Sequence, residues 1–89
     1  MFSGIVEAMG MVKKIEESGS SLDITIQSDF SADTYIDQSI AHNGVCLTVT
    51  HQNETDYKVT AIKETLEKTN LGYWKVGDLV NLERSLFAN

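Results

Sequence analysis

Short segments in which apolar and polar residues alternate recur along the chain, and this alternation is typical of strands that bury one face. The clearest case is residues 22–27, where Leu22, Ile24 and Ile26 occupy every second position. Gly10 interrupts the first apolar segment and is expected to mark a bend or a bulge. Six strands are predicted in all, at residues 5–15, 22–27, 39–42, 45–50, 57–62 and 79–84.

Two stretches between the predicted strands favour helical turns. Residues 28–38 are less periodic and predict a loop with one helical turn near residues 31–35, where Ser31 is a candidate cap. Residues 64–71 contain good helix formers, and Gly72 directly after them is suited to end the helix as a C-cap. One or two short helices are therefore expected.

Turn-forming residues join the strands in a way that favours antiparallel pairing. Asn43 and Gly44 both tolerate positive φ, as a two-residue hairpin turn requires. Six strands in a chain of 89 residues favour a closed antiparallel barrel over an open sheet, because closure removes the exposed edges that invite aggregation. We expect one domain over residues 1–89, and the alternation alone leaves its topology open.

Composition and charge narrow the classes of partner. The chain carries 7 basic and 13 acidic residues, for a formal net charge of −6. Nucleic acids and anionic membranes are bound through concentrated positive charge, so neither is an expected partner. Solubility is a sufficient explanation of the excess acidity.

The small number of cysteines and histidines excludes a disulfide-stabilised domain and a zinc-binding domain. Cys46 is the single cysteine, so no internal disulfide forms, and a reducing compartment is expected. His42 and His51 add no spacing typical of a zinc site. We interpret His42 as a structural residue of the neighbouring turn and His51 as a surface residue. No apolar run is long enough to cross a bilayer and no secretory signal is recognisable, so a cytoplasmic location is expected.

The predicted strand at residues 45–50 has one apolar and one polar face. Val45, Leu47 and Val49 share the face that must be buried, so the other face carries a thiol and two hydroxyls in a row. Small polar side chains of this kind suit a pocket for a polar heterocycle. They equally suit a strand that simply faces water, because Thr favours strands. The alternation alone favours the second interpretation.

Three stretches together resemble the N-terminal barrel of riboflavin synthase. They are Met-Phe-Ser-Gly-Ile-Val at residues 1–6, Ile-Ala-His-Asn-Gly-Val-Cys-Leu-Thr-Val-Thr at residues 40–50, and Lys-Glu-Thr-Leu at residues 63–66 followed by Asn-Leu-Gly at residues 70–72. The resemblance extends to residue 84. It implies a six-stranded Greek-key barrel that binds 6,7-dimethyl-8-ribityllumazine or riboflavin.

The resemblance also implies which residues form the site. The 60–65 stretch is expected to hold the edge of the heterocycle, largely through backbone groups left free where a strand ends and a helix begins. Ser39 and Cys46 are the candidates for catalytic contacts, with Cys46 lining the pocket rather than acting as a covalent nucleophile. The full set of binding residues is Gly4, Ile5, Val6, Cys46, Leu47, Thr48, Thr60, Ala61, Ile62, Lys63, Glu64 and Thr65.

The family's reaction transfers a four-carbon unit between two identical lumazines and needs no cofactor or metal. The products are riboflavin and 5-amino-6-ribitylamino-pyrimidinedione. The resemblance implies a homotrimer for the two-barrel enzyme, whose sites each use one N-terminal and one C-terminal barrel. This chain ends where a second barrel would begin, so we expect a ligand-binding homodimer with little or no turnover. The alternative is a non-catalytic lumazine or flavin carrier.

Overall fold

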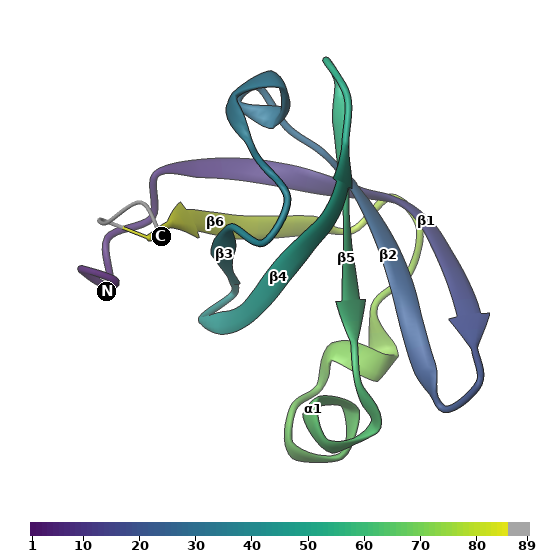
Figure 1. Ribbon diagram of the computed structural model, residues 1–89. Helices are drawn as coiled ribbons and strands as arrows, with labels where there is room; N and C mark the ends of the chain where they lie inside the picture. Colours follow the sequence, from purple (N-terminus) through teal and green to yellow (C-terminus); the bar gives the residue numbers. More distant parts are fainter. Residues whose placement is uncertain (86–89) are drawn as a thin grey trace.

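The computed structural model describes residues 1–85 as a closed antiparallel barrel of six strands, which confirms the predicted fold class (Figure 1). One short α-helix and two 3-10 turns lie between the strands. In chain order the elements are β1 (Ala8–Ser18), β2 (Ser21–Gln27), η1 (Ser31–Asp33), β3 (Ser39–His42), β4 (Val45–Gln52), β5 (Asp56–Ala61), α1 (Lys63–Lys68), η2 (Leu71–Tyr73) and β6 (Leu79–Arg84).

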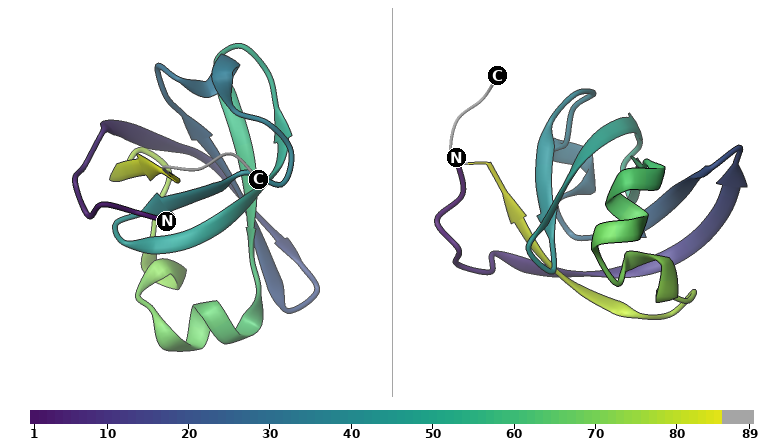
Figure 2. Two further views of the ribbon diagram at one scale, coloured as in Figure 1. Left: turned by 60° about the vertical axis from the view of Figure 1, so that its left-hand side comes forward. Right: turned by 90° about the horizontal axis from the view of Figure 1, so that it is seen from below.

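The strands follow one another around the barrel in the order β1-β2-β5-β4-β3-β6. Tight turns join β3, β4 and β5, and the long connection through α1 and η2 brings β6 back beside β3, which is the Greek-key arrangement. The connection through η1 and the connection through α1 lie on opposite sides of the barrel (Figures 1 and 2). In this order β5, β4, β3 and β6 lie side by side in the barrel wall, although β3 and β6 are far apart in the sequence.

β1 closes the barrel because it pairs with two different strands. Its first residues, Ala8 to Met11, pair with β6, while Met11 to Ser18 pair with β2. Met11 pairs with both strands, and a bulge between Val12 and Lys14, inside the pairing with β2, increases the local twist of β1.

The core consists of the inward-facing side chain of every second strand residue. Ile24, Ile26, Leu82 and Val59 are fully buried, and Tyr57 is the largest of the buried side chains. Leu66 and Trp74 are partly buried against this core from the α1–η2 connection. The alternation predicted for residues 22–27 and 45–50 is therefore confirmed.

Several local predictions are wrong by a few residues or in their mechanism. β1 begins at Ala8 rather than at residue 5, so Ile5 and Val6 lie outside the sheet. The helix ends at Lys68 and a separate 3-10 turn follows it; Gly72 lies within that turn without positive φ. Ser31 does not cap η1, because Phe30 holds the N-cap position and the Ser31 hydroxyl bonds Ser28 instead.

The Asn43-Gly44 turn is confirmed, whereas the interpretation of His42 as a turn residue is wrong. Asn43 and Gly44 have φ of 50° and 84°, as a two-residue hairpin with positive φ at both positions requires. His42 is fully buried in the barrel: its Nδ1–H donates to the Ile40 carbonyl at 2.9 Å, and its Nε2 accepts from the Tyr57 hydroxyl at 2.7 Å.

Gly10 is required by packing rather than by a bend. A Cβ at this position would lie 2.7 Å from Ile26 Cγ2 and 2.7 Å from Leu82 Cδ1, and both of these side chains are fully buried. We expect Gly10→Ala to lower the free energy of unfolding by about 1–3 kcal/mol, as overpacking of a core does. Chemical denaturation would measure it. Gly72→Ala is the matched control, since open space surrounds its Cβ, and an equal loss in both variants would contradict this role of Gly10.

Candidate functional site

The outer face of β4 carries Cys46 and Thr48, two of the residues predicted to bind a ligand. Cys46 and Thr48 are exposed, whereas Leu47 and Val49 between and after them are buried in the core. Two short polar groups therefore stand side by side on the outside of the barrel wall, over a rigid apolar layer.

β3 extends this surface by one strand. Ser39 is paired with Thr48, and Ala41 is paired with Cys46, so each pair projects to the same side of the sheet. Ala41 is in turn paired with Glu83 of β6. A single row, Glu83–Ala41–Cys46, crosses three adjacent strands on the outside of the barrel. Cys46 is exposed, whereas Ala41 and Glu83 are each only 8% exposed.

The end of β5 and the start of α1 border the other side. Thr60, one position beyond the Val49–Val59 pair, is half-buried, and its hydroxyl donates to Asp23 Oδ1 at 2.7 Å. Ala61 is buried in the core and Ile62 is exposed.

The first turn of α1 has no side-chain cap. Ile62 holds the N-cap position, and Thr65 lies inside the helix. Thr65 is half-buried, while Lys63 and Glu64 are exposed. The first backbone N–H groups of a helix lack intrahelical acceptors and remain available to a ligand.

The N-terminal segment lies beside the end of β6 (Figure 1). Ile5 and Val6 are 73% and 53% exposed, which is unusual for two adjacent apolar residues. Gly4 has φ of 83°, and a Cβ there would meet nothing within 4 Å. Glycine is thus needed at this position for its backbone conformation and not for space.

The structure does not bring Cys46 and His42 together as nucleophile and base. Cys46 is exposed on the outer face, whereas both ring nitrogens of His42 are engaged inside the barrel. Burial lowers the pKa of His42 to about 4, so its imidazole is neutral at physiological pH. These contacts agree with a structural role for His42.

Two hollows lie away from the predicted residues. One, of about 260 Å³, is bordered by Thr25 of β2 and by residues of β4, β5 and the turn between them. The other, of about 480 Å³, is bordered by Met9, Gly10, Met11 and Leu79 on one side and by Gln27, Ser28, Asp29, Glu54 and Thr55 on the other. Neither contains a residue that the sequence assigned to the site.

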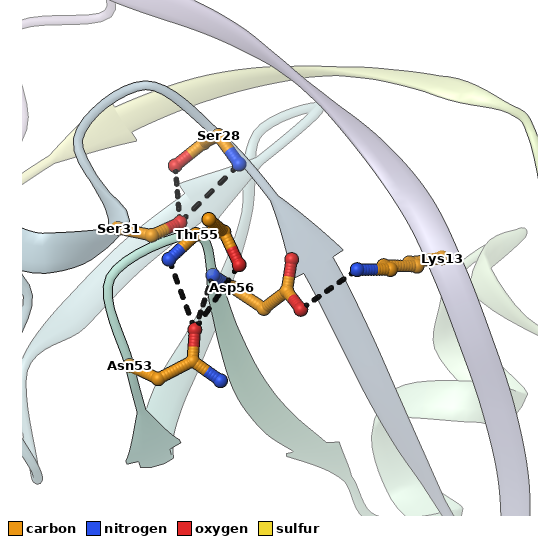
Figure 3. Close-up of polar contacts among 6 residues, drawn as sticks. All are labelled: Lys13, Ser28, Ser31, Asn53, Thr55 and Asp56. Atoms are coloured by element: carbon orange, nitrogen blue, oxygen red, sulfur yellow. Dashed lines mark hydrogen bonds and ion pairs between the residues drawn. The ribbon is translucent and has the colours of Figure 1, made fainter.

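The polar contacts near these hollows stabilise turns (Figure 3). Asn53 Oδ1 accepts from the backbone N–H groups of Thr55 and Asp56, at 2.9 and 2.8 Å, and so closes the β4–β5 turn. The ammonium of Lys13 lies 3.0 Å from Asp56 Oδ2. Within residues 1–85, no group of three or more His, Cys, Asp or Glu side chains is placed to hold a metal ion.

Glu83 and Ala41 belong to this surface but were not predicted from the sequence. Ala41 is an unremarkable residue in a short strand, and nothing near it signals that it lies between a thiol and a carboxylate. Glu83 looks like an ordinary outward-facing strand residue, yet it is 8% exposed and accepts hydrogen bonds from Ser3 and Gly4. The pairing of β6 with β3 shows that Ala41 and Glu83 lie side by side on this surface.

A closed six-stranded Greek-key barrel places this chain among the small antiparallel β-barrel domains. The chain belongs to the lumazine binding domain family, whose model matches residues 3–85. No helix within residues 1–85 has the length and apolar character needed to span a membrane.

Curated relatives of this chain are riboflavin synthases. The protein of Photobacterium phosphoreum is 41% identical over 88 residues, which cover 97% of this chain and 40% of that relative. The protein of Bacillus amyloliquefaciens is 41% identical over 90 residues, covering 100% of this chain and 42% of the relative. The chain therefore spans about two fifths of the length of the relatives it matches.

A solved structure of LumP in complex with 6,7-dimethyl-8-(1'-D-ribityl)lumazine is similar in three dimensions. It superposes with a TM-score of 0.87 at 27% identity, covering 97% of this chain and 49% of LumP. A second LumP structure, in complex with flavin mononucleotide, superposes with a TM-score of 0.84 at 24% identity and supports the fold alone.

Proposed function

We propose that this domain binds one molecule of 6,7-dimethyl-8-ribityllumazine or riboflavin against the outer wall of β3, β4 and β5. The observation that carries the proposal is the row of outward-facing small and polar residues across adjacent strands, with exposed Cys46 and Thr48 among them. The exposed apolar side chains of Ile5, Val6 and Ile62 border it. Membership of the lumazine binding domain family supports it, as does the likeness to LumP with its ribityllumazine.

Each part of the surface has a distinct role in this proposal. Ala41 and Cys46 form a floor low enough for a flat ring to approach the sheet. Thr48 and Ser39 supply hydroxyls, which donate or accept according to the ligand atom they meet. The stretch 60–65 offers backbone N–H and C=O groups to the alternating acceptors and donors of the pyrimidinedione edge, and Ile5 and Val6 cover the ring from the N-terminal side.

The binding residues of the proposal are those assigned from the sequence, with Leu47 contributing through its backbone because its side chain is buried. Cys46 acts as a contact and not as a covalent nucleophile, since His42 is directed into the core. Exposed Lys63 and Glu64 act through their backbone atoms, and the Lys63 side chain can also contact the ribityl chain, whereas the Glu64 carboxylate is paired with Lys68 at 3.1 Å.

We further propose that the domain alone gives little or no turnover. The reaction joins two identical lumazines, so two binding surfaces must face each other, and correct mutual orientation supplies most of the rate. One barrel offers one such surface. A homodimer with two-fold symmetry would place two surfaces together, and it is the state we expect in solution.

Titration tests this proposal. Purified domain should quench riboflavin fluorescence and ribityllumazine fluorescence saturably at micromolar concentrations, with one ligand bound per chain. Light scattering on the same sample should give the mass of two chains. Absence of saturable quenching by either ligand would contradict the binding function, and a monomer that binds ligand would contradict the homodimer alone.

A carrier of lumazine or flavin is the second candidate, favoured by the likeness to LumP. Incubation with 6,7-dimethyl-8-ribityllumazine tests this candidate, because a carrier forms no riboflavin and any enzymatic formation of riboflavin would rule it out. The increase in riboflavin absorbance over the reaction without protein is the measurement.

A further inference from the structure

The strongest unexplained feature at the edge of the proposed binding surface is the buried carboxylate of Glu83. Its side chain faces outward from β6, where a glutamate normally extends into water, yet the residue is only 8% exposed. Residues 1–7, which belong to no strand, are held over it.

Three donors from the N-terminal segment converge on this carboxylate. The backbone N–H and the hydroxyl of Ser3 donate to Oε2 at 2.6 and 2.8 Å, and the backbone N–H of Gly4 donates to Oε1 at 3.1 Å. The Ile5 N–H donates to the Ser3 hydroxyl at 3.2 Å. Three consecutive backbone N–H groups are therefore satisfied by one carboxylate, two directly and one through a hydroxyl.

The conformation of the segment is the one that this arrangement needs. Consecutive N–H groups point to one side when a left-handed residue lies among them, and they then form a concave site for an anion. Gly4, with φ of 83°, supplies the left-handed residue. In this chain the anion is a side chain of the barrel itself, so the concave site fixes the segment to β6.

A second anchor lies just beyond Val6. The Glu7 N–H donates to the Leu82 carbonyl at 2.8 Å, and the Glu7 carboxylate is paired with the guanidinium of Arg84. Arg84 in turn lies over the ring of Phe30, 4.5 Å from its centre. Ile5 and Val6 therefore lie between two fixed points of the chain: Ser3 and Gly4 are bonded to Glu83, and Glu7 is paired with Arg84.

We infer that Glu83 is a positioning residue for ligand binding: by holding Ser3 and Gly4 it sets where Ile5 and Val6 lie at the edge of the binding surface. The inference rests on the proposed function, in which those two residues cover the ring. Glu83 lies in the same row as Ala41 and Cys46, so the anchor and the floor of the surface are fixed by the same strand pairing.

Glu83→Gln tests this role, because glutamine keeps the size of the side chain but replaces one acceptor oxygen with a donor. We expect the segment to be released and the Kd for 6,7-dimethyl-8-ribityllumazine to rise five- to tenfold. NMR of ¹⁵N-labelled protein without ligand provides an independent measurement: heteronuclear NOE values of residues 3–6 should fall, while those of the strands stay unchanged. Glu17→Gln, at an exposed position of β1, is the matched control and should change neither quantity.

Ser3→Ala is a second variant that leaves every barrel residue intact. It removes one donor to Glu83 and the acceptor of the Ile5 N–H, and a two- to threefold rise in Kd is expected. It also decides the question if Glu83→Gln does not fold.

The possible outcomes separate the two proposals. Release of the segment together with weaker binding supports the positioning role. Release with unchanged Kd overturns it, and so does a segment that stays ordered in both variants. A wild-type protein that binds neither ribityllumazine nor riboflavin overturns the proposed function, and the positioning role with it, whatever the NOE values of the variants.

Discussion

Thr48→Trp is expected to weaken the binding of 6,7-dimethyl-8-ribityllumazine at least a hundredfold while leaving the barrel folded. Thr48 is exposed on the outer face of β4, paired with Ser39 and flanked in its own strand by buried Leu47 and Val49. An indole at this position would project from the rigid wall into the space that the ring occupies in the proposed complex. A hundredfold loss corresponds to about 2.7 kcal/mol.

The control for this variant lies on the same strand. His51 is exposed near the end of β4, beyond the bulge that follows Val49, and His51→Trp adds a similar side chain outside the proposed surface. Both variants should keep the wild-type stability, since aromatic residues are well tolerated in strands. Titration by fluorescence quenching gives the two Kd values. Wild-type affinity in Thr48→Trp would show that the ligand binds elsewhere.

The buried pair of His42 and Tyr57 is expected to make stability fall by about 3 kcal/mol between pH 7 and pH 4. Burial lowers the pKa of His42 from 6.5 to about 4, so the folded chain leaves the imidazole neutral where the unfolded chain protonates it. Protonation therefore stabilises the unfolded state relative to the folded state as the pH falls below 6.5, and the loss of stability levels off below pH 4. Burial also raises the pKa of Tyr57, which remains a neutral hydroxyl throughout.

The contribution of His42 is measured by denaturation at several pH values. The double variant His42→Leu/Tyr57→Phe removes both polar partners at once, so neither group is left buried without a hydrogen bond. It should lose the part of the pH dependence that belongs to His42. His51→Gln removes the other histidine from the surface and should retain that part. An unchanged pH dependence in the double variant would show that the His42 imidazole is protonated in the native state.

Much of the fold could be predicted because its strands bury one face each. The alternation of Leu22, Ile24 and Ile26 fixes which side of β2 is core, and the Asn43-Gly44 pair admits few turns other than a tight hairpin. The limits of β1 could not be predicted, because Ile5 and Val6 are apolar yet exposed. Hydrophobicity indicates burial within a domain but does not distinguish it from a surface that contacts a ligand or a partner.

The candidate site was harder to predict from the sequence than the fold. The exposed polar face of β4 follows from alternation, and its neighbours on β3 follow from the predicted hairpin, but the neighbour on β6 depends on a pairing between segments some forty residues apart, that of Ala41 with Glu83. The buried state of Glu83 arises from a segment at the opposite end of the chain. Likewise, the inward direction of His42 could not be predicted, because its partner Tyr57 becomes its neighbour only when the barrel closes.

Chemical-shift mapping decides most directly whether the outer wall of β3, β4 and β5 is the binding surface. Amide resonances of ¹⁵N-labelled protein would be followed while 6,7-dimethyl-8-ribityllumazine is added. We expect the largest shifts at residues 4–6, 46–48 and 60–65. Shifts grouped instead around either hollow, at Met9 and Met11 or at Gln52 and Lys58, or no shifts at all, would contradict the proposal.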